Sequence, residues 1–188
     1  VPAMIYSVVV KIGWDIFVAL GVFVLGCLAV MVLHVFGTMS VWLKLFTRYS
    51  PLDFWRRIRP VLVTAFSTSS SNATLPTALA AAREDLGIRP STAGFVLPLG
   101  TTMNMAGTAL YEGCVVLFVA QVFGVDLSLA KQLTLLLLAV LSAVAVAAIP
   151  GGSLPLIAGL LAAFGIPPEG IGIILGVDRL LDMTRTMV

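Results

Sequence analysis

The 188-residue chain is 60% hydrophobic and only 11% charged, and its net charge is +2. Globular proteins carry roughly 25% charged residues, so a water-soluble fold of this size would expose far too much apolar surface. Composition therefore excludes an ordinary soluble domain. It predicts an all-α integral membrane protein whose partner is the lipid bilayer, with no nucleic acid partner. Both ends of the chain fall inside apolar or helical text, without a secretory signal, so we expect a fragment of a longer protein.

The first apolar run predicts a transmembrane helix within residues 1–47. Its stretch 12–36 is already long enough to cross about 30 Å of hydrocarbon. Asp15 and His34 lie near the two ends of this stretch, and His34 is expected to be packed or interfacial rather than a metal ligand. Basic residues of short loops stay on the cytoplasmic side, so the helix should end inside the cell. Five basic residues follow in sixteen positions: Lys44, Arg48, Arg56, Arg57 and Arg59.

A polar stretch, "AFSTSSSNATLP" at 65–76, interrupts the apolar text that follows. It is flanked on both sides by basic residues, with Arg83 and Arg89 behind it. A straight span would place these flanks on opposite sides of the membrane. A re-entrant helical hairpin over 51–86 keeps both flanks inside and places the polar tip at mid-membrane depth, where it must be buried in protein or line a cavity. At such a tip the hydroxyl groups can cap the broken helices, and helix N-termini attract anionic groups.

The next transmembrane helix is predicted over 91–125 and contains "TTMNMAGTALYEG". Asn104, Thr108 and Glu112 are spaced to form one stripe on a helix. Oxygen atoms there can coordinate a hard cation such as Na⁺, or the side chains can hydrogen-bond to neighbouring helices. Glu112 can carry a proton, because burial disfavours the charged form of a carboxyl group, or it can pair with a cation or a neighbouring helix.

A second re-entrant hairpin is predicted over 128–166, with "IPGGSLP" at its tip and without a basic cluster in the loop before it. Residues 169–188 then begin a last transmembrane helix. Two hairpins that open from opposite faces are typical of the inverted repeats of secondary transporters. Cys27 and Cys114 lie in apolar runs and are expected to be small core residues.

Three charged residues of the last helix, Asp178, Asp182 and Arg185, are spaced to share one face. Charged groups deep in a span are energetically unfavourable and usually mark a pathway or a paired site. A purely structural ion-pair network is the alternative, above all for Asp178 with Arg179. For Asp182 and Arg185 the intramembrane setting favours a functional role.

Four motifs in order, "SSSNATLP", "TTMNMAGTALYEG", "IPGGS" and "DRLLDMTRTMV", resemble the glutamate transporter family, the dicarboxylate/amino acid:cation symporters. The resemblance implies an elevator-type transporter rather than an enzyme, a homotrimer in its full-length form, spanning the plasma or inner cell membrane several times. The chain would be most of its mobile transport domain. Na⁺ and/or H⁺ would be coupling ions, and no other cofactor is implied.

The resemblance also implies roles for individual residues. Asp182 would take the substrate ammonium and Arg185 the side-chain carboxylate, for which the planar guanidinium is suited. An acidic amino acid, aspartate or glutamate, is then the expected substrate. The other residues implied in substrate binding are Ser70, Ser71, Thr108, Ile149, Gly151, Gly152, Ser153 and Thr186. The implied cation ligands are Gly100, Thr102 and Asn104.

The chain departs from the family pattern in three places. Ala106 replaces the acidic residue of the family's NMDGT motif, which removes an anionic ligand from one sodium site. Ser69 and Met183 stand where many members carry an additional arginine. The family's NVxGD continuation falls beyond Val188. Glu112 matches a glutamate that the family's animal members use in proton coupling.

Three other functions compete with this interpretation. A C4-dicarboxylate:cation symporter is the nearest alternative. An intramembrane serine hydrolase using Ser70 or Ser71 would need a base within hydrogen-bond reach, and His34 shows no motif that would provide it. A non-transporting membrane fragment or a passive anion pore is the third.

Overall fold

The computed structural model describes residues 15–146 and 148–188, which form helices and connecting segments with no strand among them. The predicted all-α fold is confirmed for this part of the chain. The first fourteen residues of the first predicted span, and the side chain of Asp15, lie outside the described part. Two helical segments are long and apolar enough to cross a membrane, Ile16–Phe46 and Pro90–Val122.

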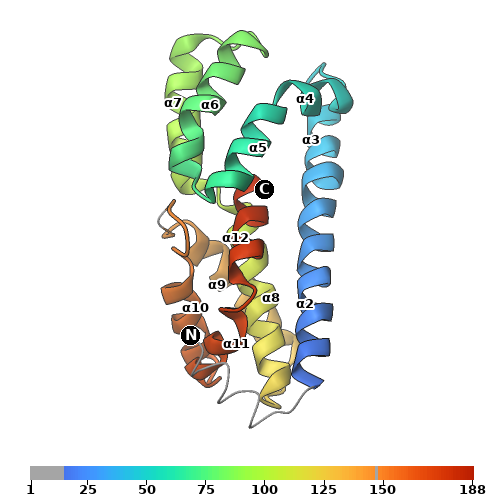
Figure 1. The fold of residues 1–188 in the computed structure, drawn as a ribbon, viewed down its shortest axis with the longest axis vertical. Helices are drawn as coiled ribbons and strands as arrows, with labels where there is room; N and C mark the ends of the chain where they lie inside the picture. Colours follow the sequence, from blue (N-terminus) through green and yellow to red (C-terminus); the bar gives the residue numbers. More distant parts are fainter. Residues whose placement is uncertain (1–14, 147) are drawn as a thin grey trace.

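The first of these segments is one continuous rod along one side of the molecule (Figure 1). It consists of α2 (Asp15–Val32), the π-helical turn η1 (Leu33–Thr38) and α3 (Met39–Phe46). The backbone keeps helical angles at both junctions, with φ −62° and ψ −44° at Val32 and φ −57° and ψ −49° at Thr38. Because π turns inside helices frequently occur at functional positions, the placement of His34 within η1 is relevant to the site.

A short helix, α4 (Pro51–Arg57), leads into the helix pair α5 (Arg59–Thr68) and α6 (Ser71–Glu84). The turn between α5 and α6 is the serine-rich stretch. Ser69 adopts the left-handed conformation with φ 51°, and Ser70 caps α6 by accepting a hydrogen bond from the Ala73 N–H at 3.3 Å. This turn lies near the middle of the molecule in Figure 1.

The outer ends of the α5–α6 pair lie together at one end of the molecule (Figure 1). The Tyr49 hydroxyl donates to the Leu86 carbonyl at 2.7 Å, and Arg57 Nη1 donates to the Asp85 carbonyl at 2.5 Å. The basic segment before α5 therefore contacts the end of α6 directly. Both basic flanks of the serine-rich stretch belong to the same end of the fold.

The predicted helix over 91–125 is broken in its middle. It consists of α7 (Pro90–Met103) and α8 (Ala106–Val122), and the residues between them are not helical. Asn104 ends α7 with φ −109° and ψ 76°. The single stripe of Asn104, Thr108 and Glu112 is therefore wrong: only Thr108 and Glu112 share a helix, because the break turns Asn104 out of their register.

The C-terminal part begins with α9 (Leu129–Ala143) and α10 (Leu154–Ala163), which are joined by a non-helical segment that contains "IPGGS". The last predicted helix is also divided. After η2 (Pro168–Gly170) it consists of α11 (Ile171–Ile174) and α12 (Asp178–Met187). Gly176 lies in the gap between them, and glycine weakens a helix interior.

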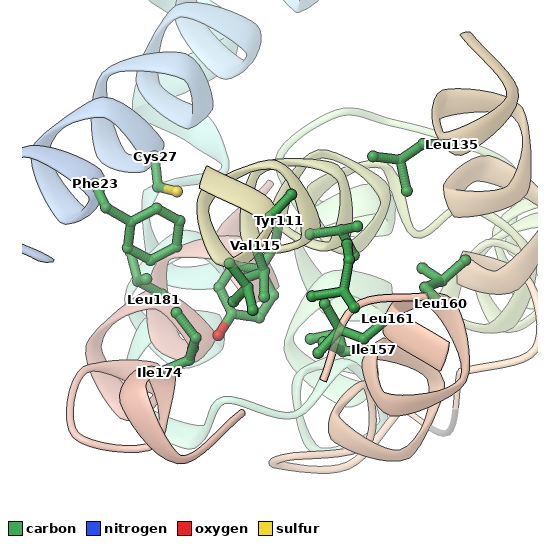
Figure 2. Packing of buried hydrophobic residues seen from close by; sticks show 14 of the residues in the cluster. Phe23, Cys27, Tyr111, Val115, Leu135, Ile157, Leu160, Leu161, Ile174 and Leu181 are labelled. Atoms are coloured by element: carbon green, nitrogen blue, oxygen red, sulfur yellow. The ribbon is translucent and has the colours of Figure 1, made fainter. Parts of the chain in front are cut away.

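The apolar core surrounds α8, which packs between α2 on one side and α9 to α12 on the other (Figure 2). Tyr111 and Val115 of α8 are completely buried, as are Leu135, Leu161 and Leu181 from other helices. Cys27 belongs to this core and Cys114 packs against it, both as free thiols. Their predicted role as core residues is confirmed.

Candidate functional site

The two polar non-helical segments meet in the interior of the fold. The Ser70 hydroxyl donates a buried hydrogen bond of 2.9 Å to the carbonyl of Ala148, 78 positions further along the chain. One serine therefore caps α6 and also connects the serine-rich turn to the segment before α10. Capping and assembly of the site are two functions of the same side chain.

Asp182 and Arg185 form a buried ion pair beside these segments. Arg185 Nε and Nη2 approach Asp182 Oδ1 at 2.8 and 2.6 Å, and only 3% of Asp182 and 6% of Arg185 are exposed. Two charges are buried only where their attraction and further hydrogen bonds offset the lost hydration. The exposed Arg179 lies 4.0 Å from Asp182 Oδ2, so it adds little.

The segment 149–153 covers this ion pair. The Gly151 N–H donates to Asp182 Oδ2 at 3.0 Å, and Arg185 Nη1 donates to the hydroxyl of the fully buried Ser153. Gly151 has φ 72°, in the left-handed region that glycine adopts readily. The Tyr111 ring lies under the guanidinium, 4.9 Å from Arg185 Cζ to the ring centroid.

Tyr111 also determines the partner of Asp178. Its hydroxyl donates to Asp178 Oδ1 at 2.7 Å, and both side chains are buried. The suggested pairing of Asp178 with Arg179 is wrong, because Arg179 points towards Asp182 and the solvent instead. Tyr111 was not singled out as a site residue from sequence, since a tyrosine in an apolar helix has no distinguishing pattern.

A cavity of about 50 Å³ lies between the ion pair and the broken helices. A water molecule takes about 30 Å³ in the liquid, so this cavity is too small for an amino acid. Seven of the predicted site residues line it: Ser71, Asn104, Thr108, Ile149, Asp182, Arg185 and Thr186. Ser69 and Ala106 line it as well. The hydroxyl of Ser69 is buried and has no hydrogen-bond partner among the described residues, so it is a further candidate ligand.

The predicted cation ligands lie at the end of α7. The Gly100 carbonyl accepts the Asn104 N–H at 3.0 Å, and the Thr102 hydroxyl donates to the Leu99 carbonyl at 3.0 Å. Each of these oxygen atoms keeps a lone pair, and a helix C-terminus leaves carbonyl groups without intrahelical partners. The donor set consists of neutral oxygens, which fits a hard monovalent cation. Of the three, only Asn104 lines the cavity.

Glu112 lies away from the cavity, inside the core. It is completely buried, and its Oε2 accepts a hydrogen bond from the Ser142 hydroxyl of α9. Its Oε1 has no partner among the described residues. Such a carboxyl group can hold either a proton or a charge, and it connects α8 to the helix that precedes the 149–153 segment.

The alternative of a serine hydrolase finds no support in the described residues. Ser70 is bonded to Ala148 and Ala73 rather than to a histidine. His34 lines a second, larger cavity of about 310 Å³, together with Asn104 and Ala106, and its Nε2 has no partner among the described residues. No base is therefore within reach of Ser70.

An all-helical fold in which broken helices converge on a buried carboxylate–guanidinium pair defines a substrate site of the kind found in secondary transporters. All 188 residues match the family model of the sodium:dicarboxylate symporters. The chain belongs to the sodium:dicarboxylate symporter family, which is a family of membrane transporters.

Three curated relatives show how widely the chain is similar within this family. It is 38% identical over 93% of its length to the neutral amino acid transporter B(0) of Mus musculus, and 36% identical over 93% to the excitatory amino acid transporter 3 of the same species. It is 35% identical over 99% to the proton/sodium-glutamate symport protein of Bacillus subtilis. The chain spans 32%, 34% and 43% of these three relatives.

Proposed function

We propose that the full-length protein is a secondary active symporter of acidic amino acids, L-aspartate or L-glutamate, driven by a gradient of Na⁺ and/or H⁺. The observation that supports this substrate is the buried pair of Asp182 and Arg185. An amino acid with a side-chain carboxylate presents one cation and one anion to these two groups. Asp182 would bind the ammonium and Arg185 the side-chain carboxylate, so that no buried charge is left without a partner.

The remaining polar groups of the site would bind the α-carboxylate. Ser71 lies in the first turn of α6, and Ser69 holds its free hydroxyl in the same cavity. The N–H groups of a helix N-terminus and the helix dipole favour negative charge. Thr108 and Thr186 line the cavity from α8 and α12 and would complete the set, with Ile149, Gly151, Gly152 and Ser153 above the substrate.

Coupling would use two kinds of group. Gly100, Thr102 and Asn104 would provide neutral oxygens for Na⁺, without the carboxylate that Ala106 replaces. Glu112 would carry a proton between the core and the α9 helix, through its contact with Ser142. The family description supports cation coupling in general, and the proton contribution is specific to this proposal.

The arrangement in the membrane is also proposed. The α5–α6 and α9–α10 pairs would be re-entrant hairpins whose turns meet at the middle of the bilayer, with the basic end of the molecule in the cytoplasm. The contact between Ser70 and Ala148 supports this meeting of the two turns. The chain would form most of a mobile transport domain in a trimeric elevator-type transporter of the cell membrane.

Uptake of labelled L-aspartate into proteoliposomes containing the full-length protein tests the proposal. An inward Na⁺ gradient and an inward proton gradient are imposed separately, with unlabelled succinate as competitor. Na⁺-driven uptake would mean that the neutral oxygens suffice, and proton-driven uptake without Na⁺ would assign coupling to Glu112. Uptake of succinate but not aspartate would favour the C4-dicarboxylate symporter, which the family description also supports. Linear, gradient-independent flux would indicate a passive pore.

A further inference from the structure

We propose that the segment 149–153 is a tethered competitor of the substrate, with Ser153 as the residue that sets its strength. The inference rests on the proposed function for the identity of the substrate, but the contacts themselves do not depend on it. The segment supplies one hydrogen-bond donor to Asp182, the Gly151 N–H, and one acceptor to Arg185, the Ser153 hydroxyl. These are the two kinds of group that an acidic amino acid would offer.

The guanidinium group of Arg185 has no nitrogen left for an external ligand. Nε and Nη2 are occupied by Asp182, and Nη1 donates to Ser153. One face of the group is covered by the Tyr111 ring at 4.9 Å. Because a carboxylate is held best by two parallel N–H donors, a substrate must displace at least one internal partner. Ser153, a neutral acceptor, is displaced more easily than the charged Asp182.

The space in the site leads to the same conclusion. A cavity of about 50 Å³ does not hold an amino acid, so the covering segment must move before the substrate enters. Movement of the segment breaks the contacts of Gly151 and Ser153 together, because both belong to one short non-helical stretch. The structure therefore describes a closed state in which the site is filled by its own chain.

Competition of this kind lowers the apparent affinity of the substrate. The apparent Kd equals the intrinsic Kd divided by the fraction of molecules whose site is free. A hydrogen bond to a charged group that forms only in the closed state reduces that fraction. Loss of the Ser153 hydroxyl should therefore raise substrate affinity, whereas loss of a hydroxyl that binds the substrate would lower it.

The first measurement is equilibrium binding of labelled L-aspartate to the full-length protein, for the wild type and for Ser153→Ala. We expect Ser153→Ala to bind about three- to tenfold more tightly. Ser153→Thr, which keeps a hydroxyl, should bind like the wild type. Ser128→Ala is the matched control: Ser128 is an exposed serine that caps α9 by accepting from Lys131 N–H. Unchanged or weaker binding by Ser153→Ala overturns the proposal, and a gain in affinity cannot result from misfolding.

The second measurement needs no substrate, so it separates this inference from the proposed function. Hydrogen–deuterium exchange of the ligand-free protein reports the opening of the segment, because the Gly151 N–H is protected by Asp182. Ser153→Ala should speed exchange in peptides covering 149–153 by about three- to tenfold, and leave α9 unchanged. Equal exchange in the variant and the wild type overturns the tethered competitor, even if the protein binds a dicarboxylate instead of aspartate.

Discussion

At the scale of single residues, Arg185 is the group on which the proposed substrate depends. It is 6% exposed, and its partners are a carboxylate, a hydroxyl group and an aromatic ring. A buried guanidinium with this set of contacts is held in one orientation, which is a condition for binding a carboxylate through two hydrogen bonds. A lysine would provide a charge at this place but not the fork.

Replacement of Arg185 by cysteine is expected to abolish uptake of acidic amino acids. Removal of one member of a buried charge pair reduces binding by about 2–5 kcal/mol. The measurement is the initial rate of L-aspartate uptake by the full-length protein at several concentrations. Arg179→Cys is the matched control, because Arg179 is on the same helix, is 61% exposed and lies 4.0 Å from Asp182; it should keep most of the uptake. Unchanged uptake by Arg185→Cys would remove Arg185 from the site.

Replacement of Asp182 by asparagine tests the proposed ammonium site. The asparagine keeps the shape of the side chain but not its charge, so it should weaken amino acid binding much more than dicarboxylate binding. Competition of L-aspartate and succinate for the same labelled ligand gives the two affinities. If both decrease by the same factor, Asp182 only holds Arg185 in place, which the 2.6 Å ion pair would also explain.

At the scale of helices, the close approach of α8 and α12 brings Thr108 to the ion pair. Gly107 is the contact point: a Cβ atom there would overlap the Arg185 carbonyl and lie 2.9 Å from Val188 Cβ. Backbone atoms cannot move aside as a flexible side chain can. The sequence "AGT" at 106–108 therefore permits a helix crossing that any larger residue would open.

Gly107→Ala is expected to separate these helices and to impair the site. Overpacking of this kind destabilises a protein by about 1–3 kcal/mol, although alanine alone favours a helix over glycine. The measurement is thermal unfolding of the full-length protein together with L-aspartate binding. The matched control is Gly113→Ala on the same helix, where a Cβ would meet only Leu136 Cδ2 at 3.7 Å. A variant Gly107→Ala as stable and active as Gly113→Ala would contradict the close crossing.

The sequence allowed the charged pair of α12 to be predicted, because charges at helical spacing are conspicuous in apolar text. It did not allow the break between α7 and α8 to be placed. The residues Met103, Asn104 and Met105 contain neither proline nor glycine, so no local signal ends the helix there. The contacts of Asp182 with Gly151 and of Arg185 with Ser153 join positions 31 and 32 apart, and such pairs follow only from the packing of whole helices.

At the scale of the whole molecule, the two ends of the α5–α6 pair decide how the fold lies in the membrane. Contacts of Tyr49 with Leu86 and of Arg57 with Asp85 hold these ends together. The alternative of a straight span would place them about a membrane thickness apart, roughly 30 Å. The exposed loop before α9 belongs to the other end of the molecule (Figure 1).

Accessibility of single cysteines to a membrane-impermeant thiol reagent distinguishes the two arrangements. Arg59→Cys and Arg83→Cys are introduced separately into the full-length protein, at exposed positions on α5 and α6, and Ser128→Cys before α9 is the reference for the opposite side. In right-side-out vesicles we expect labelling at position 128 only, and in inverted vesicles labelling at 59 and 83 only, because basic flanks stay in the cytoplasm. Labelling of 59 and 83 from opposite sides would show that α5 and α6 cross the bilayer. The serine-rich turn would then not lie in the site, and the contact of Ser70 with Ala148 would need another explanation.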